Sequence, residues 1–453
     1  MGRSGNGEKH IRPAGGPRRQ FLFHNIMDKI NIPYPFPESM IQRPRGTRDF
    51  VPDDMERRRF YEGILRKTSK TFGFREIATP IFEEAELFIL KSGPNIMNEI
   101  YAFKDKGDRD IALRPELTAP VMRMFVNELS NEPKPLKLFY FGQCFRYERP
   151  QSGRYREFFQ FGAELIGNAN PEADAEVIAL AASMIKALGL KEYKIRIGHI
   201  GILRQRLIDA GVPQERMPEV LQKLDKKLYD EALPIMNDLG VPNEKAEEIF
   251  ELTETIGGKE VLDKVKDESA DYLRNVVDIL SNMGVNDIEI DMGVVRGLDY
   301  YTGMVFEAEA PALGAEKQIC GGGSYSLTEL FGGEKVFSTG FAIGFDRILL
   351  AMEKEGLEFK HVGVDAYVIP VSDSVRGKCA EIAATLRAAG IATDIDIMGR
   401  KMQKAMKHAS SVSARYCVIV GENELKDNAV TLRDMSSGDQ TTVKINDLIK
   451  AIH

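Results

Sequence analysis

The chain has 453 residues, of which 43% are hydrophobic and 28% charged, and this composition excludes a disordered or fibrous protein. Its net charge of −7 excludes a protein that coats nucleic acid through bulk positive charge. No apolar run approaches the ~20 residues that span a bilayer, and the four cysteines lie too far apart for a disulfide framework or a metal-binding pair. We expect a cytoplasmic protein of about three domains with no membrane segment.

Residues 1–40 form a basic extension with frequent glycines and no apolar periodicity, so we expect a flexible tail, and a role in RNA contact stays open. The first predicted helix begins at Pro52, which two aspartates follow, and it ends near Gly73. Its apolar face recurs every four residues, at Phe60, Ile64, Thr68 and Phe72.

The next elements predict a β-rich domain with a helical interruption. Residues 80–167 alternate short apolar runs with Gly and Pro, which is typical of an antiparallel sheet. A helix over 173–188 and a strand near 195–197 follow, then a charged helical stretch over 203–286, and strand texture resumes from 288 to 344 before a helix over 345–355. The predicted domains are therefore 41–202 and 287–355 as two parts of one β-rich domain, with 203–286 as a helical insertion.

After a linker at 356–362, residues 363–453 alternate strands and helices, which indicates a small α/β domain with a parallel or mixed sheet. The expected strands are 366–370, 393–397, 416–420 and 429–435, and the expected helices include 374–389 and 446–452. After Gly399, a basic helix face is predicted from Arg400, Lys404 and Lys407, and phosphate contact or a merely solvated face both remain open.

Common catalytic signatures are missing from the sequence. There is no G-x-x-x-x-G-K-[ST], no G-x-G-x-x-G that opens a helix after a strand, no H-E-x-x-H and no G-x-S-x-G. The six histidines are scattered, so we expect no metal site built from protein ligands alone.

The segment 145–160 (FRYERPQSGRYREFFQ) carries four arginines between two strand-like runs. An arginine fork matches phosphate or carboxylate oxygens, and Arg146 and Glu148 share one face of a strand. Phe158 can stack on a base, while Gln160 and Glu164 can hydrogen-bond a polar ligand. A salt-bridged surface hairpin explains the same composition equally well.

Three further segments combine glycines with reactive side chains. Residues 295–303 (VRGLDYYTG) place an arginine ahead of two tyrosines, and 320–325 (CGGGSY) precede another glycine-rich strand. In 340–348 (GFAIGFDRI), Arg347 falls in the first turn of a helix, a position that suits a polyphosphate. Taken singly, each segment also fits a tight turn with core tyrosines or a surface arginine.

In this order, the segments resemble a class II aminoacyl-tRNA synthetase from about Arg43 onward. Pro80 is similar to the motif 1 proline of the dimer interface, 145–148 with Phe158 to motif 2, and 340–347 to motif 3. The runs 296–301 (RGLDYY), 113–119 (LRPELTA), 45–49 (RGTRD) and 414–422 (ARYCVIVGE) resemble the histidyl-tRNA synthetases, many of which have Gly in place of Leu117. The implied fold is an α+β catalytic domain with an antiparallel sheet flanked by helices, a helical insertion and a C-terminal α/β anticodon-binding domain.

The resemblance implies the roles of individual residues. Arg296 and Arg146 are the implied catalytic arginines, and Arg146 would hold the α-phosphate and the substrate carboxylate. Glu116 and Thr118 would receive the α-amino group of histidine, Glu164 and Tyr301 would hold its imidazole, and Tyr325 would close the pocket. The full implied histidine set is Glu116, Leu117, Thr118, Arg146, Gln160, Glu164, Arg296, Tyr300, Tyr301 and Tyr325.

For ATP, the resemblance implies stacking of adenine on Phe158 and contact of Arg154 and Arg347 with the outer phosphates, with Arg146 and Glu148 in the same site. Gln151 and Arg156 would approach the acceptor end of the tRNA, and Arg400, Lys404 and Lys407 its anticodon arm. The implied partners are histidine tRNA, L-histidine, ATP with Mg²⁺, and a second copy of the chain in a homodimer.

The sequence departs from the family in one place, where Ser324 and Ser326 replace the usual arginine and aspartate. Loss of both charges together suggests that an ion pair between them was removed. Competing interpretations are a non-catalytic paralogue such as a regulatory subunit of ATP phosphoribosyltransferase, a synthetase for threonine or proline, and an RNA-binding module. The intact RGLDYY run and the C-terminal domain argue against the first, and the lack of metal ligands argues against a threonine enzyme.

Overall fold

The computed structural model describes residues 42–148, 153–294, 300–359 and 361–453. Residues 42–49 belong to a different unit from the rest of the described chain, and they contain a turn in which the Thr47 N–H donates to the Pro44 carbonyl. The predicted basic extension at 1–40 lies outside the described residues. No helix in the described ranges is long and apolar enough to cross a membrane.

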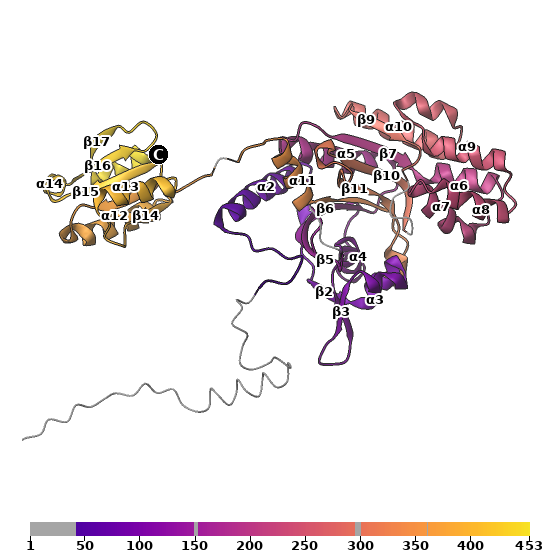
Figure 1. Cartoon of the computed structure of the whole chain (residues 1–453), viewed down its shortest axis with the longest axis horizontal. Helices are drawn as coiled ribbons and strands as arrows, with labels where there is room; N and C mark the ends of the chain where they lie inside the picture. The colour runs from indigo at the N-terminus through magenta and orange to yellow at the C-terminus, as the bar shows by residue number, and fades with distance from the viewer. Residues whose placement is uncertain (1–41, 149–152, 295–299, 360) are drawn as a thin grey trace, which may run out of the picture. The chain divides into compact units, whose positions relative to one another are not determined.

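Within the described residues, nine strands form one large sheet (Figure 1). Their order across the sheet is β1 (Arg75–Glu76), β5 (Leu136–Phe145), β6 (Glu157–Ile166), β12 (Ser338–Gly344), β11 (Gln318–Tyr325), β10 (Tyr301–Glu309), β7 (Lys194–His199), β9 (Ile288–Asp291) and β8 (Ile256–Gly257). All neighbours are antiparallel except β1 with β5 and β7 with β9. The predicted antiparallel sheet is confirmed for its centre, and it brings the segment 157–166 beside 338–344.

The two faces of the sheet pack against different helices. Phe139 and Phe161 face one core, together with α5 (Pro171–Ala187), α10 (Glu268–Asn282) and α11 (Phe345–Lys354). Leu138 and Tyr140 face the other core, with α4 (Thr118–Met124). This alternation follows from the period of two along a strand. In Figure 1, α5 and α10 accordingly lie on one side of the sheet and α4 on the other.

Helix α2 (Pro52–Thr71) confirms the predicted first helix, but only part of the predicted apolar face packs, since Ile64 and Phe72 lie half-buried against the core whereas Phe60 does not. Its buried side chains are Arg58, Tyr61, Glu62, Leu65 and Ser69. Phe60 is 51% exposed. The inward face of α2 is set by a tertiary contact and not by Phe60. Arg58 Nη1 forms a buried ion pair with Asp346 Oδ1 of α11 at 2.7 Å. A buried charge requires such a partner, so this pair helps to fix which face turns inward.

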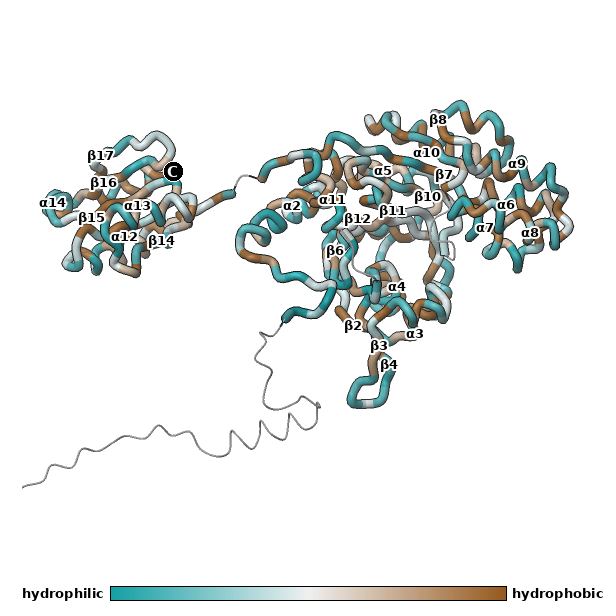
Figure 2. The backbone as a smooth tube through the Cα atoms, in the orientation of Figure 1, coloured by the Kyte–Doolittle hydropathy of each residue, from teal (hydrophilic) through white to brown (hydrophobic). Residues whose placement is uncertain are grey.

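The stretch after β7 is helical, as predicted. It contains α6 (Ile200–Asp209), α7 (Met217–Asp225), α8 (Tyr229–Asp238) and α9 (Asn243–Thr253). Along these helices, hydrophilic and hydrophobic positions alternate in Figure 2, consistent with one packed face each. The chain then returns to the large sheet through β8, and the apolar face of α10 joins the same core as α5.

A second sheet of the described residues contains β14 (Thr393–Ile395), β13 (Ala366–Pro370), β15 (Tyr416–Val420), β16 (Ala429–Asp434) and β17 (Gln440–Lys444), in that order. It is mixed, since β13 is parallel to β14 and β15 whereas β16 is antiparallel to both of its neighbours. The sheet is accompanied by α12 (Arg376–Ala388), α13 (Met402–Ser411), α14 (Glu422–Lys426) and α15 (Leu448–Ile452). The sequence prediction missed α14 and β17, and β17 is a mostly exposed strand of polar residues with no apolar alternation.

A third, small sheet orders β2 (Phe82–Glu84), β4 (Asp110–Leu113) and β3 (Tyr101–Lys104). Helix α3 (Ala85–Ser92) follows β2 directly and packs against α4. Its apolar residues Ala85, Leu87 and Phe88 form a core of their own with Ala119 of α4. As a result, the last turn of α3 is held beside the first turn of α4, where the candidate site begins.

Candidate functional site

A cavity of about 670 Å³ opens on the α4 side of the large sheet. It is bounded by α3, the start of α4, and strands β6, β10, β11 and β12. The predicted residues that line it are Glu116, Thr118, Arg146, Glu148, Arg154, Phe158, Gln160, Glu164, Tyr300, Tyr301, Tyr325 and Arg347. The fold thus brings residues from five separate parts of the sequence to one place.

Glu164 lies at the closed end of the cavity and is 1% exposed. Its carboxylate accepts hydrogen bonds from the Tyr325 hydroxyl at 2.5 Å, the Tyr140 hydroxyl at 2.9 Å and Thr118 Oγ1 at 3.1 Å. Burial raises the pKa of Glu164 to about 7, although the three hydroxyl donors oppose that rise. An ionised carboxylate has about four acceptor sites, so the three hydroxyl donors leave room for one further N–H.

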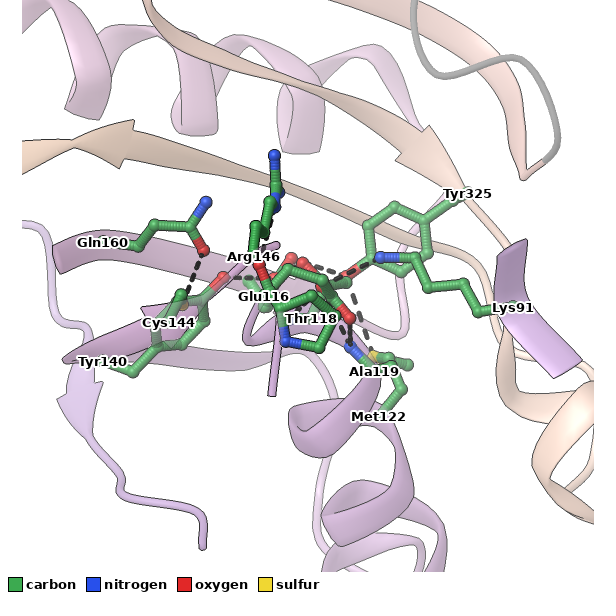
Figure 3. A network of polar contacts seen from close by, with 12 residues as sticks. Lys91, Glu116, Thr118, Ala119, Met122, Tyr140, Cys144, Arg146, Gln160 and Tyr325 are labelled. Atoms are coloured by element: carbon green, nitrogen blue, oxygen red, sulfur yellow. Dashed lines mark hydrogen bonds and ion pairs between the residues drawn. The ribbon is translucent and has the colours of Figure 1, made fainter. Parts of the chain in front are cut away.

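Glu116 lies next to this network, two residues ahead of the start of α4 at Thr118 (Figure 3). It accepts the backbone N–H of Thr118 at 2.7 Å and of Ala119 at 3.1 Å, and it pairs with Lys91 Nζ at 2.9 Å. Burial opposes ionisation of Glu116, but the Lys91 ammonium and the two backbone donors outweigh burial, so the pKa of Glu116 is lowered. The site keeps Glu116 as an anion.

Three tyrosines form the wall opposite Glu116. The ring centroids of Tyr300 and Tyr301 are 4.3 Å apart, and Tyr300 and Tyr325 meet edge to face at 5.8 Å. Tyr301 and Tyr325 are 7% and 2% exposed. A closed end with an aromatic wall and carboxylates at its base suits a small, partly aromatic ligand that carries nitrogen donors.

The open end of the cavity is dominated by arginines. Arg146 Nε donates to the Pro115 carbonyl at 3.0 Å, and its guanidinium stands 5.2 Å from the centroid of the Phe158 ring. Glu148 lies between two arginines, with 3.8 Å to Arg146 Nη1 and 3.8 Å to Arg154 Nη1. These separations are longer than a hydrogen bond, so Glu148 does not satisfy the Nη1 donors of either arginine and they stay able to bind a ligand.

Arg154 and Arg347 lie at the outer edge of this end. Arg154 Nη2 pairs with Glu316 Oε2 at 2.5 Å. Arg347 Nε donates to the Gln318 carbonyl at 2.6 Å, and its Nη2 donates to the Glu316 carbonyl. Partial burial and the nearby Arg154 lower the pKa of Arg347. Two cations held this close favour an anionic ligand between them.

Some predicted residues lie elsewhere. Leu117 is 2% exposed and packs in the core with Val121 and Tyr140, so its side chain does not line the cavity. Arg156 Nε donates to the Glu148 carbonyl at 3.1 Å, and its guanidinium lies 4.2 Å from the centroid of the Tyr147 ring. Gln151 and Arg296 lie outside the described residues.

The predicted basic helix face in the C-terminal part needs one correction. Helix α13 begins at Met402, so Arg400 precedes it. Arg400 Nη1 pairs with the buried carboxylate of Asp396 at 2.7 Å. Lys404 and Lys407 are exposed on the helix, as expected from the burial of Ala405. The local sequence could not reveal that Arg400 has an acidic partner in the preceding loop.

The two serines that depart from the family pattern have different partners. Ser324 Oγ donates to the carboxylate of Asp174 on α5, at 2.8 Å to each oxygen. Ser326 Oγ donates to the Val336 carbonyl at 3.4 Å. The structure therefore does not support the interpretation of a lost pair between positions 324 and 326. Position 324 faces Asp174 on the other side of the sheet from the cavity.

Sequence reasoning missed several residues of the site, among them Lys91, Tyr140 and Glu316. Lys91 follows a run of apolar residues in α3, and a single charge next to such a run needs a partner if it is buried. This pattern could have identified Lys91 as a buried residue of the site. Tyr140 was inside a predicted strand, but nothing local to it shows that it meets Glu164. Glu316 is one of many charged residues in turns and carries no comparable signal.

Among the residues described, no three His, Cys, Asp or Glu side chains are grouped to hold a metal ion. The carboxylate of Glu148 nevertheless suits Mg²⁺, which usually binds one or two carboxylates together with waters and substrate phosphates. It lies among the arginines of the open end and its ion pairs are long. The donor set at this end therefore fits a phosphate-bound Mg²⁺.

Comparisons with known proteins converge on one family. The family model for histidyl-tRNA synthetase matches residues 46–348, and that for an anticodon binding domain matches 365–453. The histidine–tRNA ligase of Archaeoglobus fulgidus is 47% identical over 91% of this chain and 99% of that protein. The histidine–tRNA ligase of Methanosarcina acetivorans is 45% identical over 91% of this chain and 98% of that protein.

Solved structures agree. The apo histidyl-tRNA synthetase of S. aureus superposes with a TM-score of 0.70 at 30% identity, and covers 91% of this chain and 100% of that one. A Bacillus halodurans protein described as an ATP phosphoribosyltransferase regulatory subunit/histidyl-tRNA synthetase has a TM-score of 0.73 at 25% identity, over 85% of this chain and 100% of that one. The curated ligases are more similar in sequence, so the regulatory-subunit alternative is not favoured. The chain belongs to the histidyl-tRNA synthetase family of class II aminoacyl-tRNA synthetases.

Proposed function

We propose that the cavity activates L-histidine with ATP and that the chain then transfers the histidyl group to the 3′ end of histidine tRNA. As a member of its family, the chain is a histidine–tRNA ligase with ATP, histidine and tRNA as substrates. The observation that carries the assignment to this cavity is its polarity. Buried carboxylate Glu164 lies at one end, and arginines Arg146, Arg154 and Arg347 lie at the other.

Histidine fits the closed end. The carboxylate of Glu164 accepts an imidazole N–H, while Tyr301 and Tyr325 enclose the ring. Glu116 receives the α-ammonium group, assisted by Thr118 and Gln160 at the cavity wall. Such a pocket rejects other amino acids because an apolar side chain leaves the buried Glu164 and its tyrosine partners without a hydrogen-bonding ligand.

ATP fits the open end, with adenine stacked on Phe158 and the outer phosphates on Arg154 and Arg347. The histidine carboxylate attacks the α-phosphorus, the bond to the bridging oxygen breaks, and pyrophosphate leaves. Arg146 stabilises the negative charge that develops on the α-phosphate oxygens, and Arg296 is proposed to do the same. No protein nucleophile is needed, since the attacking group belongs to the substrate.

Mg²⁺ would be held by Glu148 together with the phosphates, where it offsets phosphate charge. In the second step the terminal ribose hydroxyl of the tRNA attacks the carbonyl carbon of the adenylate, the bond from that carbon to the phosphate oxygen breaks, and AMP leaves. Gln151 and Arg156 are proposed to lie near the acceptor end. The domain division predicted from the sequence stays part of this proposal, with residues 363–453 and the exposed Lys404 and Lys407 reading the anticodon arm.

We also propose a homodimer. Ile81 and Phe82, which follow the motif 1 proline, are 43% and 56% exposed, and Phe103 of the same small sheet is 50% exposed. A symmetric partner would cover this apolar surface. Light scattering at assay concentrations should give twice the chain mass, and an active monomer would contradict the proposal.

ATP–pyrophosphate exchange, run with each amino acid singly, tests the proposed reaction. Only histidine should support exchange, and exchange with another amino acid alone would overturn the pocket assignment. Arg296→Ala should lower the exchange rate by ~10²–10³ with histidine binding retained. Removal of the residues after Lys360 should preserve exchange and abolish most tRNA charging, provided that the dimer survives, whereas full charging by the truncated protein would refute the anticodon assignment.

A further inference from the structure

Lys91 is a buried cation in the wall of the cavity that the predicted site does not include. It occupies the last turn of α3, is 7% exposed, and its ammonium lies 2.9 Å from Glu116 Oε2. A lysine charge is not buried unless it has partners, and a fully buried unpaired one is very costly. Its position is therefore fixed by groups of the site itself.

The first of these groups is Glu116. Oε2 receives both the Lys91 ammonium and the Thr118 N–H, and Oε1 receives the Ala119 N–H. Two of these three donors belong to the backbone of α4 and do not depend on side-chain identity. Lys91 is thus the single side chain among the three donors, and it both orients the carboxylate and favours its ionised form.

The second group is Tyr300. The Lys91 ammonium lies 4.4 Å from the centroid of the Tyr300 ring, within the range of a cation–π contact. Tyr300 packs in turn against Tyr301 and Tyr325. Lys91 therefore links the carboxylate at the base of the closed end to the aromatic wall that faces it, as Figure 3 shows for its approach to Glu116.

We infer that Lys91 is a positioning residue for the amino-acid substrate: it holds Glu116 ionised and aimed, and it fixes the Tyr300 wall, so that the α-ammonium group of histidine finds a preformed acceptor. This inference rests on the proposed function. Lys91 acts through Glu116 and Tyr300 and does not itself contact the reacting atoms. Its effect is therefore specific to histidine affinity and spares ATP affinity, since the arginines at the open end do not touch it.

Lys91→Met tests the inference, because methionine keeps the length and packing of the stem while the charge is lost. We expect the KM for histidine in ATP–pyrophosphate exchange to rise about 10- to 100-fold, the range for one hydrogen bond to a charged group, with the KM for ATP unchanged. Lys91→Gln keeps a donor without the charge and should lie between. Lys91→Arg should restore most of the affinity.

Two further measurements separate positioning from general stability. In Lys91→Met the pKa of Glu116 should rise, so the KM for histidine should worsen more steeply as the pH falls than it does in the parent protein, where only Glu164 contributes. In a Glu116→Gln background, Lys91→Met should add little to the KM for histidine. Full additivity of the two changes would overturn the inference.

Lys137→Met is the matched control. Lys137 Nζ also pairs with a carboxylate, Glu176 at 2.5 Å, and lies 5.5 Å from the centroid of the Phe74 ring, outside the cavity. It should leave both KM values unchanged. An unchanged histidine KM in folded Lys91→Met, or equal rises for both substrates, would refute the role of Lys91. Absence of histidine-dependent exchange in the parent protein would instead refute the proposed function.

Discussion

The two ends of the cavity are built on opposite principles. At the closed end, Glu164 and Tyr325 are 1% and 2% exposed and are bonded to each other. At the open end, the side chains of Arg154 and Glu316 are 44% and 50% exposed and form an ion pair at the surface. Exposed ion pairs contribute little to stability, whereas buried polar groups are costly when their partners are lost. We therefore expect the closed end to discriminate between amino acids, and the open end to bind phosphate groups more weakly and less selectively.

The largest effect should come from the closed end. Glu164→Gln should lower kcat/KM for histidine by about 10²-fold, because an amide replaces a charged acceptor for the imidazole N–H. The KM for ATP should stay unchanged, as measured by ATP–pyrophosphate exchange. Glu309→Gln is a suitable control, since Glu309 is also a buried carboxylate of the large sheet but lies outside the cavity. Equal losses for both substrates would remove Glu164 from the amino-acid site.

A substitution at the open end should affect ATP and not histidine, and its effect should be smaller. Arg154→Met should raise the KM for ATP about tenfold, the loss of one charge-assisted contact to a phosphate. The KM for histidine should not change. A rise confined to histidine would mean that the two ends have been assigned the wrong way round.

The buried carboxylate also predicts a pH dependence that the exposed end lacks. Burial raises the pKa of Glu164 to about 7, so the carboxyl becomes neutral as the pH falls through that value and no longer accepts an imidazole N–H. We expect kcat/KM for histidine to fall several-fold from about pH 7.5 to about pH 6. The imidazole of the substrate titrates in the same pH range. The Glu164→Gln variant separates the two contributions, because it should remove the pH dependence that comes from Glu164 and keep the one that comes from the substrate.

The smallest effect should be a gain. The Glu316 carboxylate occupies Arg154 and competes with phosphate oxygens for it. Glu316→Gln should therefore lower the KM for ATP about two- to threefold, in keeping with the modest strength of an exposed ion pair. Titration of ATP at low and high salt checks this, because the difference between variant and parent should shrink as salt rises. A higher KM for ATP would show that Glu316 assists ATP binding.

Much of the architecture was determined by local sequence. Helix α5 ends before Gly189, which has a φ of 88°, and β13 coincides with the predicted strand 366–370. Apolar periodicity and turn residues act within a few positions, so they can be recognised without knowledge of the partner segments. The motif residues of the cavity were likewise recognised from their order along the chain and their family resemblance.

The tertiary structure alone decided which side chains meet. Strand β6 lies between β5 and β12, which places Glu164 beside Tyr140 and below Gly340. The packing of α3 on α4 brings Lys91 to Glu116, and the pairing of Arg58 with Asp346 turns the buried face of α2 away from Phe60. These contacts join residues that are distant in sequence. Which residues meet depends on the order of the strands in the sheet and on the cost of burying an unpaired charge. A local sequence pattern contains neither kind of information.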